Sequence, residues 1–342
     1  MVDLLPVFID ATKTVQQLME QWFAAYSAGM PWTIVSDYCI GDDGKKNDVF
    51  SFVVIANHDT TENISEYISA VAPRDIKKTR QIPLGLMQYL TCPHPVTFSV
   101  SFVIDRSSAL LRDYLRVEHM SGFIPDACKF VESLREHSPA SASLDPAYFD
   151  DVLKRLGAFE KDLARKQLNA KLSRQIHLAS GFAATMFYLV TQATQAGYLR
   201  WISDRDKLIE HNDTVVYDLA YLYFILMSSS QARPEPPSQG NLIWDVPKTY
   251  FELPDRTGKH RFDALIRLPD YLAGTLADIG PNMAYSKEKF GEMLHGVFVD
   301  SPNNWVVQLT SNGERVTARS VQYRSQRGAI VRAGQPIAKA VG

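Results

Sequence analysis

The sequence predicts an α/β fold in which a mixed β-sheet is flanked by helices. Runs of β-branched and aromatic residues at 32–37, 49–57 and 96–106 have the composition of strands. The segments at 11–29 and 174–197 carry apolar residues at helical spacing or form a largely apolar stretch long enough for a buried helix. Strand-like and helix-like segments follow one another along the chain, which is typical of this class.

Composition bounds the kind of protein. The chain has 342 residues, 46% hydrophobic and 22% charged, which is a globular composition with enough length for a substantial core. The formal net charge is −2, so a nucleic acid would have to be held by a local basic patch or with help. Cys39, Cys92 and Cys128 are widely spaced without a CxxC pair, which disfavours a disulfide framework or a zinc ribbon and favours a reducing compartment.

Several other classes are not indicated. The first residues lack the basic region and long apolar run of a secretory signal, and no stretch reaches the ~18 consecutive apolar residues of a membrane span. The sequence contains no GxGxxG, GxxxxGK[ST], HExxH or GxSxG motif. We therefore expect a soluble, cytoplasmic protein without a membrane partner.

The first strand pair carries the first candidate residue. Residues 32–37 (WTIVSD) and 49–57 are predicted to form a hairpin across a glycine-rich polar turn. Side-chain alternation places Val35 and Asp37 on one face and Ile34 on the other, so Asp37 points to one side where the strand ends. Aspartate also favours turns, so a turn-forming role for Asp37 is the alternative.

The remaining elements are predicted from apolar spacing, turn residues and helix stop signals. We expect helices at 11–29, 60–72 and after Pro83, a short polar piece at 74–80, and a strand at 96–106. A charged helical insertion at 107–172 contains a flexible joint at 137–146. Then follow a buried helix at 174–197, a short apolar segment ending at aspartates, a helix at 213–229, a loop at 231–240, a short strand at 241–245 and a core helix at 261–279. The tail is a hairpin at 305–323 that turns at Asn312-Gly313. This divides the chain into an N-terminal helix (1–30), a main domain (31–280) and a C-terminal hairpin extension (281–342).

Aspartates recur at the ends of the strand-like segments. Asp37, Asp105 and Asp204 each follow an apolar run, and Asp270 lies on a late helix. Open α/β sheets place their chemistry at strand ends, so carboxylates from distant stretches can converge there. Mg²⁺ prefers oxygen ligands, and paired ions activate water and stabilise the leaving oxygen in phosphodiester cleavage. The pattern predicts a site for Mg²⁺ or Mn²⁺.

Four short motifs occur in a recognisable order: SDYCIGD at 36–42, RDIKKTR at 74–80, WISDRD at 201–206 and LPDYLAG at 268–274. In this order the chain resembles a family of uncharacterised ribonuclease H-like proteins, which carry a DESG-type first strand, an E-I-K motif after the second strand and an (A/P)D-x-x-AG final helix. The resemblance covers most of residues 32–280. It implies a ribonuclease H-like mixed sheet and metal-dependent hydrolysis of phosphodiester bonds in RNA or DNA.

The resemblance also implies roles for individual residues. Asp37 would bridge two metal ions, and Asp270 would bind one of them from the helix. Asp75 would be a further ligand or a water-orienting acid, and Lys77 would neutralise a phosphate or developing charge. A solvated lysine pair with Lys78 is the alternative for Lys77.

Two acids compete for the place on the fourth strand. Asp204 is preferred because Asp206 supplies a second carboxylate nearby, whereas Asp105 could form an ion pair with Arg106. The metal ligands expected overall are Asp37, Asp105, Asp204, Asp206 and Asp270. The alternative for Asp204 and Asp206 is that they cap a loop or helix.

The sequence departs from the family pattern at two positions. Tyr38 stands where the family has glutamate, and Asp75 replaces the glutamate of E-I-K. These changes permit a second hypothesis, a catalytically weakened ribonuclease H-like module that binds nucleic acid or a protein partner in a defence or mobile-element system.

Overall fold

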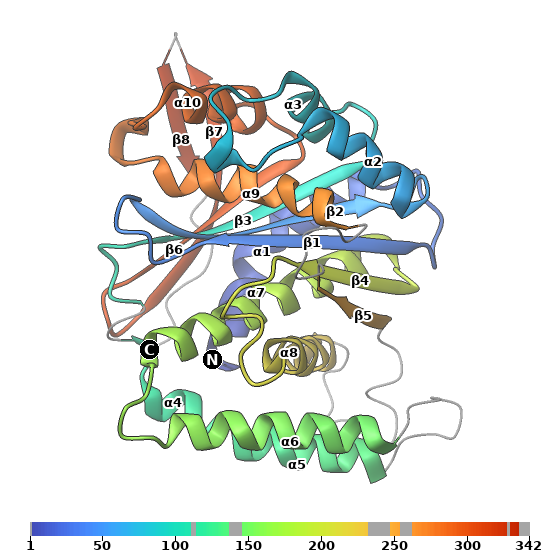
Figure 1. Ribbon diagram of the computed structural model, residues 1–342, viewed down its shortest axis with the longest axis vertical. Coiled ribbons are helices and arrows are strands. Elements are labelled where there is room, and N and C mark those ends of the chain that lie inside the picture. The colour runs from blue at the N-terminus through green and yellow to red at the C-terminus, as the bar shows by residue number, and fades with distance from the viewer. Residues whose placement is uncertain are drawn as a thin grey trace.

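The structure is a computed structural model that describes residues 2–110, 114–136, 146–231, 247–253, 262–326 and 329–334. These residues form an eight-stranded sheet in the order β5-β4-β1-β2-β3-β6-β7-β8, with helices on both faces (Figure 1). The predicted α/β class, with a mixed sheet flanked by helices, is therefore confirmed.

The strands pair in both directions. Their bounds are β1 (Pro31–Cys39), β2 (Asn47–Ala56), β3 (Thr97–Asp105), β4 (Tyr198–Ser203), β5 (Lys248–Glu252), β6 (Asn304–Ser311), β7 (Val316–Gln326) and β8 (Ala329–Gly334). β1, β2 and β3 form an antiparallel meander, and β4 and β5 extend it parallel to β1. On the other side β6 runs parallel to β3 and leads into the antiparallel strands β7 and β8. As a result β1 and β4, neighbours in the sheet, end at the same edge.

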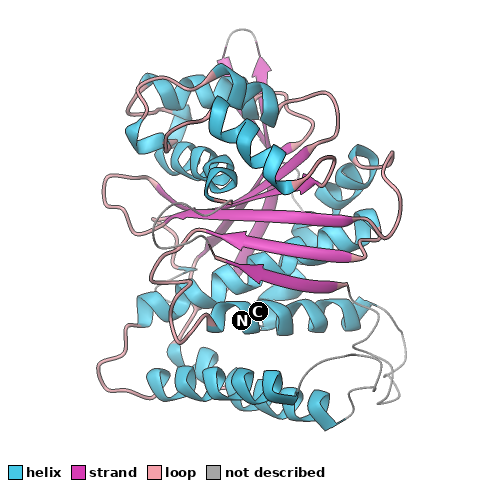
Figure 2. Ribbon diagram, turned by 45° about the vertical axis from the view of Figure 1, so that its right-hand side comes forward, coloured by secondary structure: helices cyan, strands magenta, loops and turns pink. Residues whose placement is uncertain are grey.

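The helices form a layer on each side of the sheet (Figures 1 and 2). Their bounds are η1 (Val2–Leu4), α1 (Leu5–Trp22), α2 (Thr61–Val71), η2 (Ile76–Lys78), α3 (Leu84–Leu90), α4 (Val117–Ser121), α5 (Phe123–Glu136), α6 (Pro146–Leu163), α7 (Ala170–Thr194), α8 (Val215–Gln231), α9 (Asp263–Asp278), η5 (Pro281–Met283), α10 (Glu288–Met293) and the π-helix η6 (Leu294–Phe298). Buried residues of α2, α3, α9 and α10 pack on one face of the sheet, and those of α1, α7 and α8 on the other, with α5 and α6 farther out. No described helix is long and apolar enough to cross a membrane.

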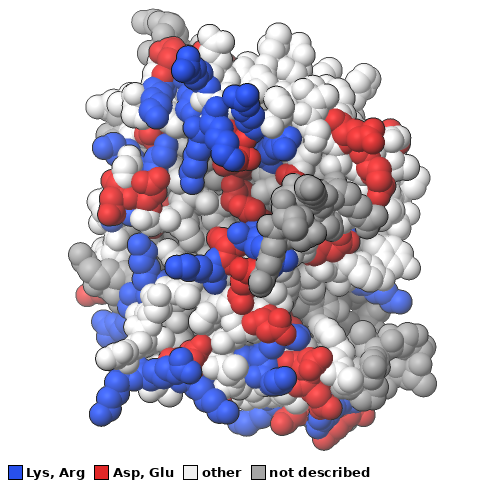
Figure 3. Space-filling view, in the orientation of Figure 1, with Lys and Arg blue, Asp and Glu red and all other residues white. Residues whose placement is uncertain are grey.

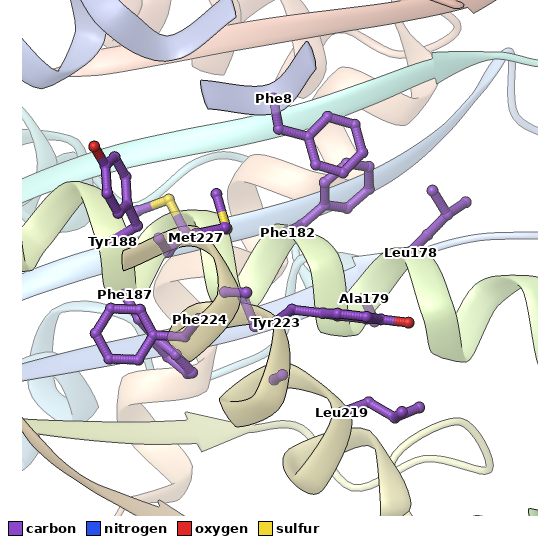
Figure 4. Packing of buried hydrophobic residues seen from close by; sticks show 14 of the residues in the cluster. Phe8, Leu178, Ala179, Phe182, Phe187, Tyr188, Leu219, Tyr223, Phe224 and Met227 are labelled. Carbon is purple, nitrogen blue, oxygen red and sulfur yellow. The ribbon is translucent and has the colours of Figure 1, made fainter. Parts of the chain in front are cut away.

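The face that carries α7 has an aromatic core. Phe8 of α1, Phe102 of β3 and Phe182 of α7 are fully buried, and the rings of Phe102 and Phe182 stack with centroids 4.2 Å apart. Figure 4 shows Phe8 and Phe182 side by side. Each such side chain contributes about 1.5–3 kcal/mol through burial. Because residues 176–190 of α7 are buried on every side, the predicted buried helix is confirmed.

Strand β1 serves both cores. Trp32 and Ile34 lie in the aromatic core, whereas Val35 packs among residues of α9 and α2 on the opposite face. This is the alternation predicted from the sequence, and it directs Asp37 to the α9 side of the sheet.

The structure differs from the prediction in several bounds. The first helix begins at Leu5. The last part of the charged helical insertion expected at 107–172 is divided, because α6 ends at Leu163 and α7 starts anew after Asn169, whose side chain accepts a hydrogen bond from the Leu172 amide at 3.1 Å. Strands β5 and β8 and helix α10 were not predicted, and the C-terminal hairpin joins the main sheet. The joint at 137–146, the loop at 231–240 and the strand at 241–245 lie outside the described residues, except for the boundary residues Pro146 and Gln231.

Candidate functional site

A cavity of about 690 Å³ lies where β1 and β4 end beneath α9. It is lined by carboxylates and by cationic side chains from parts of the chain far apart in sequence. The carboxylates are those of Asp37, Asp75, Asp204, Asp206, Asp263 and Asp270, and the cations are Lys77, Lys78, Arg205 and Arg267. The cavity thus brings together every predicted site residue except Asp105.

Asp37 lies at the end of β1 and faces α9. Its carboxylate accepts a hydrogen bond from the backbone amide of Tyr38 at 2.7 Å. Burial raises the pKa of Asp37 well above its ordinary value, and the charges of Asp270 and Asp204 raise this pKa further. The Tyr38 amide opposes these effects, but one hydrogen bond does not offset the loss of water and two nearby negative charges.

Asp37 and Asp270 form a carboxyl pair. Each side chain influences the pKa of the other, and the pKa of Asp270 is raised to about 6, mainly by burial. Two carboxylates in contact do not both ionise readily unless a cation lies between them, so without one the pair holds a proton. Such a pair is chemically suited to accept a divalent cation.

Helix α9 fixes the loop that follows α2. The second oxygen of Asp270, Oδ2, accepts the Ile76 amide at 2.8 Å. One turn further along α9, Gly274 leaves room for the same residue, since a Cβ at Gly274 would lie 2.9 Å from Ile76 Cγ2. The Asp and Gly of the LPDYLAG motif therefore have a joint physical purpose, which is to seat Ile76 against the helix.

The backbone of residues 72–79 is held at four carbonyl oxygens. Arg267 donates to Ala72 O at 2.7 Å and the Tyr271 hydroxyl donates to Arg74 O at 2.9 Å. Lys289 of α10, which is only 6% exposed, donates to the carbonyl oxygens of residues 76 and 79 at 2.5 and 2.8 Å. The segment that carries Asp75 and Lys77 is thereby fixed beside the cavity.

The end of β4 supplies two further acids. The Asp204 amide donates to Ser36 O at 3.1 Å, which holds Asp204 beside the end of β1. Asp206 accepts the Ile209 amide at 2.8 Å, so it caps a turn, as the alternative interpretation proposed, and it also lines the cavity. Burial is the main cause that raises the pKa values of both Asp204 and Asp206.

Asp105 is separated from the other acids. It ends β3, and β2 lies between β3 and β1, so Asp105 pairs in register with Asn47. Its carboxylate accepts the amide and hydroxyl of Ser107 at 2.9 and 2.7 Å. The predicted ligand role for Asp105 is thus corrected, and so is the alternative ion pair, because Arg106 bonds instead to the 42–48 turn, including Asp48 at 3.5 Å. Of the two acids considered for the fourth strand, Asp204, which directly follows β4, lines the cavity, and Asp105 does not.

Three charged cavity residues were not predicted, namely Arg205, Asp263 and Arg267. Asp263 begins α9 and lies seven residues before Asp270, which places both on one face of the helix. The charge of Asp263 is one of the causes that raise the pKa of Asp204. The i, i+7 spacing of two aspartates on a core helix was the signal available in the sequence.

Tyr38 presents a neutral group to the cavity. Its hydroxyl hydrogen bonds with Ser36 Oγ at 2.9 Å, and Ser36 in turn accepts the Trp201 indole N–H at 2.9 Å. Burial raises the pKa of Tyr38 well above its ordinary value, so the phenol stays protonated. Cys39 is likewise a neutral thiol, since burial raises its pKa to about 11.

Within the described residues, no three His, Cys, Asp or Glu side chains already form a group able to hold a metal ion. The donors that do meet, the Asp37 and Asp270 oxygens, are of the hard type that Mg²⁺ and Mn²⁺ prefer, and further carboxylates line the same cavity. Comparisons with protein-family models, with curated proteins and with solved structures found no match.

Proposed function

We propose that this protein is a Mg²⁺- or Mn²⁺-dependent nuclease that hydrolyses phosphodiester bonds of nucleic acid on a ribonuclease H-like core. The observation that carries the proposal is that the carboxyls of Asp37 and Asp270 line one cavity where strand-end and helix carboxylates meet. Isolated structural carboxylates are usually paired with a cation or left in water, whereas this pair is buried against another acid.

The placement of the four motifs supports the ribonuclease H-like assignment. The resemblance puts one acid at the end of the first strand, one after the second strand, one on the fourth strand and one on the final helix. In the structure Asp37 lies near the end of β1, Asp75 follows α2, Asp204 follows β4 and Asp270 lies on α9, and all four line one cavity. Four weak motifs that chance had produced would have no reason to meet in space.

The residues that line the cavity would have different roles in binding metal and phosphate. Asp37 and Asp270 would hold the metal, with Asp204 or Asp75 as the further ligand. Divalent ions bound there would supply an activated water and stabilise the leaving oxygen. Lys77, whose positive charge lowers the pKa of Asp270, offers its ammonium to the phosphate oxygens.

The position of Asp75 suits a supporting role. It begins the η2 turn at the cavity rim and forms an ion pair with Lys78 at 2.9 Å. A carboxylate restrained by an ion pair orients a water molecule more readily than it moves to bind a metal ion. Aspartate also has a shorter reach than glutamate, which again favours the water-orienting role over direct metal binding. The Asp37–Asp270 pair remains the centre of the proposed site.

The test uses purified protein and end-labelled RNA and DNA oligonucleotides with Mg²⁺, with Mn²⁺ or with EDTA. We expect metal-dependent cleavage that Asp37→Asn and Asp270→Asn each reduce by at least about 10²-fold, the scale of a lost electrostatic contribution to catalysis. Asp105→Asn, which makes the same charge change outside the cavity, should cleave like the wild type. Cleavage that survives both cavity substitutions would come from another protein or another site and would refute the proposal.

Tyr38 favours a second candidate, a weakened module that binds nucleic acid or a protein partner in a defence or mobile-element system. The phenol takes a place where the family has a metal-binding acid, and the described residues hold no ready three-ligand group. This candidate predicts equal binding in EDTA and in Mg²⁺ without any product. Restoring the acid with Tyr38→Glu would then be expected to leave cleavage absent if the module serves binding alone.

A further inference from the structure

Three cations on the segment after α2 are exposed and unpaired. Arg74, Lys77 and Arg80 are exposed, and none of them forms an ion pair with any described residue. Their neighbour Lys78 differs, because it pairs with Asp75 at 2.9 Å. Three cations within seven residues repel one another modestly. Water or a bound anion must offset this repulsion.

The cations do not hold the segment in place. Its carbonyl oxygens at Ala72, Arg74 and Ile76 bond to side chains of α9 and α10, as described above, and Ile76 is buried against Gly274. The backbone is anchored inward while the side chains of Arg74 and Arg80 extend into solvent. Replacing these two arginines by uncharged residues should therefore leave the fold intact.

This group of cations adjoins the cavity, because Lys77 lines it. Figure 3 shows basic side chains gathered over the region of α10 and the η2 turn, directly above acidic side chains over α9. The whole chain carries a formal net charge of −2, so the positive surface is local. An acidic peptide or an anionic membrane would be repelled by the cavity carboxylates, whereas a phosphodiester chain accompanied by divalent ions would not.

We propose that Arg74, Lys77 and Arg80 form a docking ridge for the phosphate backbone of the nucleic-acid strand that enters the cavity. This inference rests on the proposed function and names the residues that hold the flanking phosphates. Because phosphate contacts position a strand without reading its bases, the ridge gives binding with little sequence preference. Each contact releases condensed counterions, so binding through the ridge depends on salt.

The experiment measures binding separately from cleavage. Fluorescence anisotropy of labelled single-stranded RNA and DNA is followed in EDTA from about 50 to 200 mM salt, a range over which several phosphate contacts change affinity strongly. The variant Arg74→Gln/Arg80→Gln leaves Lys77 in place. For a single strand its slope of log K against log salt should fall by about 1.4, at about 0.7 per lost phosphate contact, with about tenfold or greater weakening at low salt.

A matched control removes two exposed charges elsewhere. Lys154→Gln/Lys161→Gln changes α6, which lies on the opposite side of the sheet from the cavity, and should bind within about twofold of the wild type because distant exposed charges are screened. Thermal unfolding of both double variants checks that the fold is retained. Asp37→Asn should bind in EDTA at least as well as the wild type.

The outcomes separate the two proposals. Weaker binding with a reduced salt slope in the Arg74/Arg80 variant supports the ridge, even if the wild type never cleaves, in which case the nuclease proposal alone fails. An unchanged slope, or a wild type that binds neither RNA nor DNA, overturns the ridge, even if metal-dependent cleavage is observed.

Discussion

Replacing Asp270 by asparagine should stabilise the metal-free protein at neutral pH. The carboxyl of Asp270 has a pKa of about 6 in the folded state, against an ordinary value of 3.8 when unfolded. The folded protein therefore binds this proton more tightly than the unfolded chain does. The stabilisation from the protonated form is complete below pH 3.8 and is lost as the pH rises through 6.

The size of the effect follows from the two pKa values. Their difference of about 2.2, at 1.36 kcal/mol for each pKa unit, corresponds to about 3 kcal/mol of unfolding free energy lost between pH 4 and pH 7. The asparagine side chain does not ionise, and its amide oxygen can still accept the Ile76 amide, so Asp270→Asn escapes this loss. The variant should match the wild type near pH 4 and exceed its unfolding free energy by about 3 kcal/mol at pH 7, the loss that linkage assigns to the carboxyl.

Urea unfolding in EDTA at pH 4 and pH 7, monitored by fluorescence of the buried tryptophans, measures the difference. Asp105→Asn is the matched control, because it makes the same charge change outside the cavity. Adding Mg²⁺ at pH 7 should stabilise the wild type and not the variant, because binding to the folded state alone raises its stability. A variant that is no more stable than the wild type at pH 7, or that gains equally at both pH values, would refute the argument from the carboxyl pair.

Two further substitutions test how the loop after α2 is held. Gly274→Ala should cost about 1–3 kcal/mol through its contact with Ile76, partly offset by about 1 kcal/mol of helix propensity, and should lower any cleavage. Gly157→Ala on α6, where an added Cβ meets nothing within 4 Å, should instead stabilise slightly; equal effects at both glycines in denaturant unfolding would contradict the packing argument. Lys289→Met should cost about 2–5 kcal/mol, because a buried and a partly buried carbonyl oxygen lose their donor, and should speed hydrogen exchange at residues 74–80. Unchanged exchange there would show that the ammonium does not anchor the loop.

Local patterns in the sequence were sufficient to predict the site residues that lie at the ends of β1 and β4. Asp37 and Asp204 were found because alternation and strand ends are visible in short windows, and parallel β1 and β4 bring their ends together. The same argument failed for Asp105, because the order of strands in the sheet decides which ends are neighbours. Strand order depends on long-range packing that no short window contains.

Elements at the margins of the sheet were the hardest to predict. Strand β5 has five residues, none of them buried, and among the described residues it pairs with β4 on one side. Its sequence, KTYFE, lacks the alternation of apolar and polar residues that marks a half-buried strand. Asp263 was missed for a related reason, since a residue at the start of a helix is ordinarily explained as a favourable charge near the helix dipole.

The two-sided nature of β1 has a practical consequence for protein engineering. Its α7-facing side chains can be redesigned for greater thermal stability with apolar residues, which add no charge near Asp37 and pack in a different core from the α9 side. Variant libraries restricted to positions such as Trp32 and Ile34, together with their aromatic neighbours, would be screened for thermal stability. Libraries restricted to the α9 side would be screened for changes in the activity of the cavity.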